Sequence, residues 1–372
     1  NNSINLVVIL FAGISFNIKK EIALMDITYK KQIAEYLNKI DDVIANGKYK
    51  DNWESLAEYL VPVWYKNAKF GVFLHWGVYS VPAYYSEWYP RLMYYKGNPV
   101  YWHHKKKYGK NFNYRDFVPM FKAEKFNAEE WIRLLKNAGA KYIMPVGEHH
   151  DGYKMYDSDL SQWTSVKQAA HCDFLGELKK ECEKQGVTFA TSSHRAEHFW
   201  FLNGGRTIGY DNEVLDEKYR DFYGPAHNIH KINNLHNLLK QEHGITPTKE
   251  WLEDWLVNSC ELIDKYHPET LFFDWWVMNY AFRPYMKKFL AYYYNRSVEW
   301  GKEVCVQYKS DAIMYNVGIF DRERGQLAAT SPYIWQSETS TAYNSWSYCT
   351  TNKFKTAGKI AGTFVDAVSY TH

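Results

Sequence analysis

The sequence predicts an α/β protein built as a (β/α)8-like (TIM) barrel, with an irregular or incompletely closed barrel as the alternative, and three observations support this. Short β-rich runs alternate with helical patterns from about residue 52 onward, which is typical of βα units around a parallel sheet. Nearly every β-rich run is apolar in its body and ends in a polar side chain. No linker, long charge block or internal repeat divides the chain, so we expect one catalytic domain over residues 25–372.

Seven segments are expected to be strands. In chain order they are KFGVFLHW (69–76), AKYIMPVGEHH (140–150), GVTFATSSH (186–194), ETLFFDWW (269–276), KEVCVQY (302–308), IMYNVGIFD (313–321) and YIWQSE (333–338). Two of the intervening segments carry helix signals at both ends. Residues 127–139 start with the capping residue Asn127 and end at Gly139, and residues 173–186 start with Asp173 and end at Gly186.

Titratable or amide side chains stand at or just after the ends of most of these strands. They are His75, the run Glu148, His149, His150 and Asp151, then His194, Asp274, Gln307 and Asp321. In a parallel barrel all strands point their C-terminal ends at one face, where active sites are assembled. We therefore expect these residues to line one pocket.

Composition excludes some classes of function. The net charge is only +3, and basic and acidic residues are intermixed, so no basic stripe for nucleic acid is present. The five cysteines are scattered without a C-x-x-C pair, which argues against a disulfide framework or a zinc knuckle. Aromatic residues make up 18% of the chain and offer flat apolar faces that suit carbohydrate.

The N-terminus carries an apolar segment, INLVVILFAGISF (4–16), that is too short to span a bilayer and has no Lys or Arg before it. We expect no membrane association and a cytoplasmic location. Met25 resembles a natural start. Residues 1–24 are therefore interpreted as an N-terminal extension of added or upstream sequence, with a docking segment or a secretion signal as the alternatives.

Two chemistries fit a barrel mouth of histidines and carboxylates. One is a metal-dependent hydrolase, with zinc ligands drawn from His149, His150, His194 and Asp274. The first strand offers a single His followed by Trp, and adjacent histidines on a strand are expected to diverge, so we expect no metal and no cofactor. The other is glycoside hydrolysis by two carboxylates, for which Asp274 is a candidate nucleophile.

Several long motifs resemble those of one known family. AKFGVFLHWGVYSVPAYYSEWYP, FNAEEWIRLLKNAGAKYIMPVGEHHDGYKMYDS, ETLFFDWW, YIWQSETSTAYNSWSY and KFKTAGKIAGTFVDAVS are similar, in this order, to blocks of the α-L-fucosidases of glycoside hydrolase family 29. The resemblance covers roughly residues 52–368. It implies a retaining exo-α-L-fucosidase that removes terminal fucose from glycans through a covalent intermediate. It also implies a C-terminal β-sandwich, which we expect this chain to lack.

The resemblance assigns roles to individual side chains. It implies that Asp274 is the nucleophile and that His194 lines the fucose pocket. It further implies fucose or substrate contacts from His75, Glu87, Trp88, His149, His150, Trp335 and Trp346. Phe272 stands where many relatives have Trp, and Ser347 stands where they have Gly, so the shape of the pocket is expected to differ.

The resemblance identifies the general acid less directly than the nucleophile. Many family members have Glu where this chain has Gln336, which cannot donate and recover a proton in this role. The segment FDRERGQL resembles the acid-bearing segment of other members and gives the role to Glu323. Glu338, two residues after Gln336, is the alternative.

The expected partner is a fucosylated oligosaccharide or glycoconjugate, with no nucleic acid and no membrane. A barrel that lacks its last strand would leave a sheet edge exposed, so a homo-oligomer is also expected. Two alternative functions stay open: the metal-dependent barrel hydrolase, and a fucose-binding protein without turnover.

Overall fold

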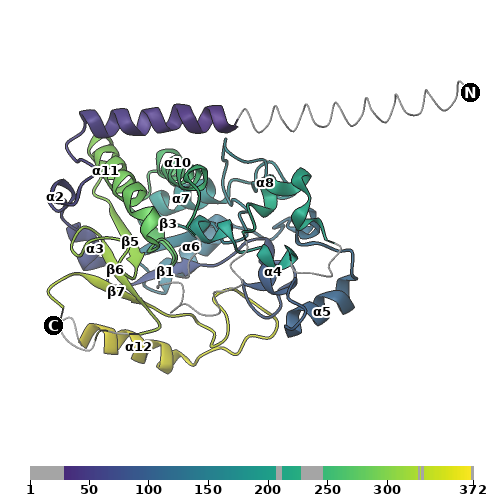
Figure 1. Ribbon diagram of the computed structural model, residues 1–372. Coiled ribbons are helices and arrows are strands. Elements are labelled where there is room, and N and C mark those ends of the chain that lie inside the picture. The colour runs from purple at the N-terminus through teal and green to yellow at the C-terminus, as the bar shows by residue number, and fades with distance from the viewer. Residues whose placement is uncertain (1–28, 207–211, 228–245, 326, 328–330, 370–372) are drawn as a thin grey trace, which may run out of the picture.

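The computed structural model describes residues 29–206, 212–227, 246–325, 327 and 331–369. Within them, seven parallel strands form one sheet in chain order, which curls into an open barrel (Figure 1). The strands are β1 (Gly71–Leu74), β2 (Tyr142–Glu148), β3 (Thr188–Ser193), β4 (Thr270–Phe273), β5 (Cys305–Lys309), β6 (Ile319–Glu323) and β7 (Trp335–Glu338). All seven predicted strands are confirmed, and so is the barrel-like fold class.

Helices cover the outside of the sheet. The α-helices are α2 (Trp53–Leu56), α3 (Val63–Ala68), α4 (Tyr89–Leu92), α5 (Pro99–Tyr108), α6 (Ala128–Asn137), α7 (Phe174–Gln185), α8 (Arg220–Tyr223), α10 (Lys249–Tyr266), α11 (Arg283–Trp300) and α12 (Ala357–Ser369). The predicted caps are present: Asn127 accepts a hydrogen bond from the Glu130 backbone, and Asp173 accepts one from the Gly176 backbone. Gly186 ends α7 in the left-handed conformation.

The two faces of the sheet bury different clusters. The inner face packs Met144, Ala190 and Phe272 against Phe73. The residues between them, such as Ile143 and Phe273, point outward into the large core shared with the helices. Inward positions near the C-terminal ends of the strands are polar, so the barrel interior is closed by apolar side chains below and opens into a polar mouth above.

Successive strands are joined by helices in the first half of the sheet and by loops in the second. Helices α6, α7, α10 and α11 precede β2 to β5, whereas no described helix lies between β5 and β6 or between β6 and β7. The segment that contains α3 packs against the second half of the sheet, at β5 and β6. Tyr65 packs with Cys305 and Ile319, and its hydroxyl donates to Gln336 of β7. An aromatic side chain from outside the sheet thus fills the lower barrel.

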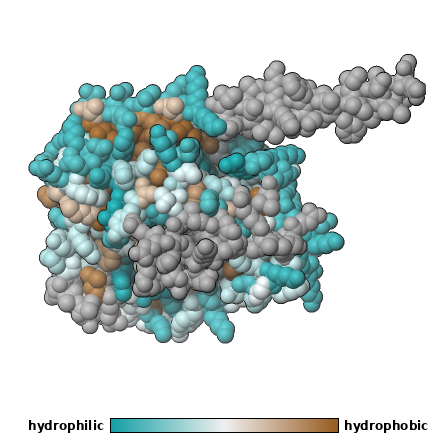
Figure 2. All heavy atoms as spheres, viewed as in Figure 1, coloured by the Kyte–Doolittle hydropathy of each residue, from teal (hydrophilic) through white to brown (hydrophobic). Residues whose placement is uncertain are grey.

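A helix over residues 29–46 lies along the outside of α10 and α11 (Figure 1). Its apolar face includes the fully buried Ile40, and apolar atoms are also visible beside it on the surface in Figure 2. Asp264 of α10 accepts hydrogen bonds from Tyr36 and Lys39 of this helix and from Tyr292 of α11. One carboxylate therefore joins three helices.

None of the helices in the described part of the chain combines the length and the apolar character that a bilayer crossing requires. The predicted N-terminal apolar segment lies outside the described residues.

Candidate active site

Four histidines converge at the mouth of the barrel, and we call them the histidine wall: His75, His149, His150 and His194. They follow the ends of β1, β2 and β3. The ring centre of His194 lies 4.7 Å from that of His149 and 5.8 Å from that of His75. The structure thus brings together the imidazoles that the strand ends predicted.

The expectation that His149 and His150 diverge was wrong. Strand β2 ends at Glu148, so the two histidines lie beyond the pleated segment, and their ring centres are only 4.2 Å apart. Potential metal-ligand atoms of His149, His150 and His194 lie within 4.8 Å of one another, as do those of His150, Glu197 and Asp274. The geometric argument made from the sequence against a metal therefore fails.

The two carboxylates that flank the histidine pair face away from this wall. Glu148 forms an ion pair with Arg195, which also binds Asp254. Asp151 accepts one hydrogen bond from the Tyr114 hydroxyl and another from the backbone N–H of Tyr153, two residues further along the chain. Burial raises the pKa of Asp151 to about 7. The run of four titratable residues therefore supplies two pocket residues and two supporting ones.

Asp274 lies directly after β4 and has donors on both carboxylate oxygens. Its Oδ1 lies 2.9 Å from Lys309 Nζ and accepts from the Trp275 backbone at 2.8 Å. Its Oδ2 lies 3.0 Å from His194 Nδ1. Burial would raise the pKa of Asp274, but Lys309 and His194 outweigh it and hold the pKa well below the usual value. The side chain is therefore an anion at neutral pH.

The ionised Asp274 fixes the proton of its histidine neighbour. A carboxylate can only accept, so His194 Nδ1 carries the hydrogen that points at Asp274. The opposite ring nitrogen of His194 forms a hydrogen bond of 2.9 Å with the Ser192 hydroxyl. Both neighbours hold this imidazole in one orientation.

Three histidines of the wall, His75, His149 and His150, are neutral. Burial, followed by the neighbouring His194, lowers the pKa of His75 well below its usual value. The same two kinds of cause act on His149, and burial lowers the pKa of His150 to about 3. The Nδ1 atom of His149 is buried and has no hydrogen-bond partner within the described residues. A buried nitrogen in this state is expected to meet a ligand or water.

Lys309 is the centre of the opposite side of the mouth. Its Nζ lies 2.9 Å from Asp274 Oδ1, 2.7 Å from Glu323 Oε2 and 2.9 Å from Glu338 Oε1. Burial would lower the pKa of Lys309, but these three carboxylates raise it well above its usual value. We call Lys309, Glu323 and Glu338 the ionic wall.

The two candidate acids differ in exposure. Glu323 and Glu338 are paired in register on β6 and β7. The Glu323 side chain is 40% exposed, whereas that of Glu338 is 13% exposed. Burial, together with the adjacent Glu338, raises the pKa of Asp321 well above its usual value. Glu338 is enclosed and Glu323 faces the opening.

Gln336 and Gln307 lie deeper in the barrel than the acids. The Gln336 amide donates to Asp321 Oδ1 at 2.8 Å and to the Gln307 side-chain oxygen at 3.3 Å. Gln307 in turn donates to the Tyr65 hydroxyl at 3.2 Å. These amides connect polar groups under the ionic wall.

Glu87 anchors a loop that carries Trp346. Its Oε2 accepts hydrogen bonds from the Ser345 hydroxyl and from the backbones of Trp346 and Ser347, at 2.9, 3.0 and 3.2 Å. The Trp346 ring stacks on His75 with centres 5.7 Å apart. Glu87 therefore joins the loop after β7 to the histidine wall, at the seam between the two walls.

The other predicted tryptophans are in different places. Trp88 lies with its ring centre 5.7 Å from that of His150 and stacks parallel to Trp275. Trp335 is on β7 next to Gln336, whose side chain points into the barrel. Since successive side chains of a strand point to opposite faces, Trp335 lies on the outer face, and the structure does not bring it to the site.

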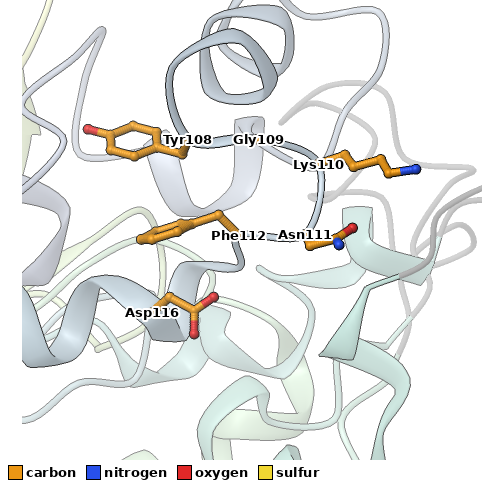
Figure 3. A pocket seen from close by; sticks show the side chains of 6 residues that line it. All are labelled: Tyr108, Gly109, Lys110, Asn111, Phe112 and Asp116. Carbon is orange, nitrogen blue, oxygen red and sulfur yellow. The ribbon is translucent and has the colours of Figure 1, made fainter.

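A separate surface pocket, with a volume of about 380 Å³, follows the end of α5 (Figure 3). It is lined by Tyr108, Gly109, Lys110, Asn111, Phe112 and Asp116. None of the predicted site residues lines it, and the rings of Tyr108 and Phe112 stack on each other.

Sequence reasoning missed two buried residues of the site. Lys309 follows the inward positions Cys305 and Gln307 at spacing two, so the alternation of β5 could have identified it. Glu197 has a carboxylate oxygen 3.4 Å from His150 Nδ1, and no hydrogen-bond partner for either oxygen occurs in the described part of the chain. Burial raises the pKa of Glu197 well above its usual value. No pattern in the sequence marks it.

A parallel barrel with an ionised carboxylate and two further carboxylates around its mouth defines a class, the barrel proteins with the site architecture of glycoside hydrolases. The family described as Alpha-L-fucosidase matches residues 36–371. The chain belongs to this family.

Individual relatives agree with this assignment. An alpha-L-fucosidase of Branchiostoma floridae is 30% identical over 302 residues, which are 76% of this chain and 59% of that protein. Tissue alpha-L-fucosidase of Homo sapiens is 40% identical over 144 residues, 38% of this chain and 31% of that protein. This chain thus matches less than two thirds of the length of either relative.

The crystal structure of Thermotoga maritima alpha-fucosidase in complex with fucose is similar to this fold. The TM-score is 0.68 at 28% sequence identity, covering 87% of this chain and 69% of that chain.

Proposed function

We propose that this protein is a retaining exo-α-L-fucosidase that hydrolyses terminal α-L-fucosyl residues through a covalent fucosyl-enzyme intermediate. The observation that carries the proposal is the contact of Lys309 with Asp274, Glu323 and Glu338. Because one ammonium bonds all three, each candidate acid lies within two hydrogen-bond lengths of the nucleophile. Retaining glycosidases need their two carboxylates about 5 Å apart, and this geometry agrees.

In the first step Asp274 attacks the anomeric carbon, and the bond from that carbon to the leaving oxygen breaks. Glu323 gives its proton to the leaving oxygen. In the second step Glu323 takes a proton from water, the water oxygen attacks the same carbon, and the ester bond to Asp274 breaks. The Asp274 carboxylate and the Glu323 proton are restored, so the cycle is balanced.

Lys309 allows this exchange of charge at low cost. The mechanism requires Asp274 as an anion and Glu323 as a proton donor at the start; afterwards Asp274 is a neutral ester and Glu323 is an anion. One negative charge thus moves between two partners of the same ammonium. The greater exposure of the Glu323 side chain, 40% against 13% for Glu338, supports Glu323 as the acid that meets the leaving group and Glu338 as a counter-charge to Lys309.

The histidine wall suits the recognition of sugar hydroxyls. A neutral imidazole can donate from one nitrogen and accept at the other, as a ring of hydroxyls requires. The unpartnered Nδ1 of His149 is such a group. A site that satisfies each of its polar groups with one hydroxyl rejects sugars in which that hydroxyl is missing.

The test is turnover of 4-nitrophenyl α-L-fucoside, together with mass spectrometry after incubation with a slow fluorinated fucosyl substrate. We expect hydrolysis, a label on the peptide that contains Asp274, and a loss of at least about a thousandfold in kcat/KM for Asp274→Ala. Asp311→Ala is the control, because Asp311 pairs with Arg283 on the surface. A label on another peptide, or an active Asp274→Ala variant, contradicts the proposal.

A metal-dependent hydrolase is the second candidate, and the convergence of His149, His150 and His194 favours it. In that case a chelator abolishes turnover and zinc restores it, whereas the glycosidase keeps its activity in chelator. A fucose-binding protein would bind the sugar and release no nitrophenol. The homo-oligomer and the cytoplasmic location stay predictions.

A further inference from the structure

Three cationic side chains surround Tyr343 beside the proposed acid, and we call Arg324, Lys355 and Lys359 the cationic rim. The Nζ atoms of Lys355 and Lys359 lie 5.9 and 5.4 Å from the centre of the Tyr343 ring. Arg324 donates to the Tyr343 carbonyl at 3.3 Å. The three positive charges are therefore gathered around one aromatic residue.

The rim adjoins the reacting groups. Arg324 is the residue after Glu323, and its backbone donates to the Glu338 carbonyl at 2.8 Å. Its guanidinium lies over the ring of Trp346, 4.6 Å from the centre. Lys355 donates to the Thr339 hydroxyl, one residue after Glu338, at 2.7 Å. A leaving group that takes its proton from Glu323 therefore lies beside this rim.

The rim is held in place by its backbone. Arg324 has φ of +49°, a left-handed value that a residue with a side chain adopts only when its surroundings fix it. The segments around Tyr343 and Phe354 pair antiparallel, with backbone bonds from Tyr343 to Lys353 and from Lys355 to Thr341. The resulting platform exposes 49% of Tyr343 and 60% of Phe354.

The charges of the rim are poorly neutralised. Arg324 comes no closer than 3.9 Å to its neighbour Glu323, and in the described part of the chain Lys355 and Lys359 form no ion pair. Lys359 also stands in the first turn of α12, where the helix dipole already favours anions and disfavours cations. Burial, with Arg324 and Lys359 as neighbours, lowers the pKa of Lys355. Mutual repulsion of this kind is relieved by a bound anion.

We propose that the cationic rim is a subsite for the leaving sugar and that it selects aglycones that carry a negative charge, as a sulfate or a carboxylate. This inference rests on the proposed fucosidase function. Tyr343 and Phe354 offer apolar faces for the sugar ring, and the ammonium and guanidinium groups bind its anionic substituent.

The test is calorimetric binding of three sulfur-linked fucosides, which resist hydrolysis: fucosyl-galactose, its sulfate ester, and fucosyl-galacturonate. In low salt we expect the wild type to bind at least one charged compound about tenfold more tightly than the neutral one. The double variant Lys355→Gln/Lys359→Gln should lose this preference and bind the neutral compound unchanged. High salt should have the same effect as the variant.

Lys184→Gln is the matched control, because this exposed lysine lies at the end of α7, which leads into the opposite end of the barrel. Preference for only the sulfate or only the carboxylate identifies the anion. Equal affinity of the wild type for all three compounds overturns the subsite, and so does an equal loss for all three in the double variant. Absence of 4-nitrophenyl fucoside turnover overturns the proposed function instead, because the binding measurement does not need turnover.

Discussion

The two walls of the barrel mouth use burial in opposite ways. In the histidine wall, burial keeps His75, His149 and His150 uncharged, and their hydrogen-bonding capacity is left for a ligand. In the ionic wall, burial is outweighed by contacts between opposite charges around Lys309. The comparison indicates a division of labour, in which one wall recognises the sugar and the other handles the charge that moves in the reaction.

Asp274 lies where the walls meet. It takes one contact from each wall, His194 on one carboxylate oxygen and Lys309 on the other. The nucleophile is thus held by an imidazole N–H and by an ammonium. Changes to the two walls should differ in their dependence on pH, because Lys309 is charged whereas the buried His75, His149 and His150 are not.

The largest effect is expected when the cation is removed. Lys309→Met leaves its carboxylate partners without a counter-charge, and we expect kcat/KM at pH 7 to fall about a hundredfold to a thousandfold. Lys309 lowers the pKa of Asp274, so its removal raises that pKa. The acidic limb of the kcat/KM profile should move to higher pH, because Asp274 must be ionised to attack.

Lys309→Arg is the control for this variant. It keeps the positive charge with altered geometry, so it should recover part of the activity and keep the acidic limb near its original position. An unshifted limb in Lys309→Met would contradict the role given to the ammonium.

A smaller effect without a pH signature is expected in the histidine wall. His149→Gln keeps a hydrogen-bonding side chain but misplaces its groups, and we expect about a tenfold loss in kcat/KM. Burial lowers the pKa of His149 well below its usual value and keeps the ring neutral, so the pH profile around neutrality should keep its shape. A displaced limb would show that His149 titrates during catalysis, and the division between the walls would then be wrong.

The smallest effect is expected at the seam. Glu87→Gln removes the charge from the acceptor of three hydrogen bonds to the Trp346 loop, which is worth about 1–2 kcal/mol. We expect a lower melting temperature and a rise of a few fold in KM, with little change in the pH profile. An unchanged melting temperature would show that the loop does not depend on this carboxylate.

The sequence predicted the strands and most of the site because both depend on local patterns. An apolar run that ends in His75, His194 or Asp274 marks a strand and also the face on which its last side chain lies. The caps at Asn127 and Asp173 are local for the same reason.

The site residues that the sequence analysis misplaced or did not identify depend on contacts between segments that are distant along the chain. The convergence of His149 and His150 follows from where β2 stops pairing with its neighbours, which periodicity does not reveal. Trp335 came from a resemblance of motifs and lies on the outer face of its strand. The role of Lys309 requires three carboxylates at or near the ends of three other strands, and no spacing along the chain predicts that these side chains meet.

The junction at Asp264 gives the outer helix an attachment that is sensitive to acid. Burial would raise the pKa of Asp264, but hydrogen bonds from Lys39, Tyr292 and Tyr36 lower it below its usual value. Its stabilising contribution is therefore complete above the pKa of the unfolded chain and is lost as the pH falls through the lower value in the fold. In strong acid the helix over residues 29–46 should detach first along this junction and uncover the apolar surface around Ile40, so that protein molecules begin to aggregate through that face while the barrel is still folded.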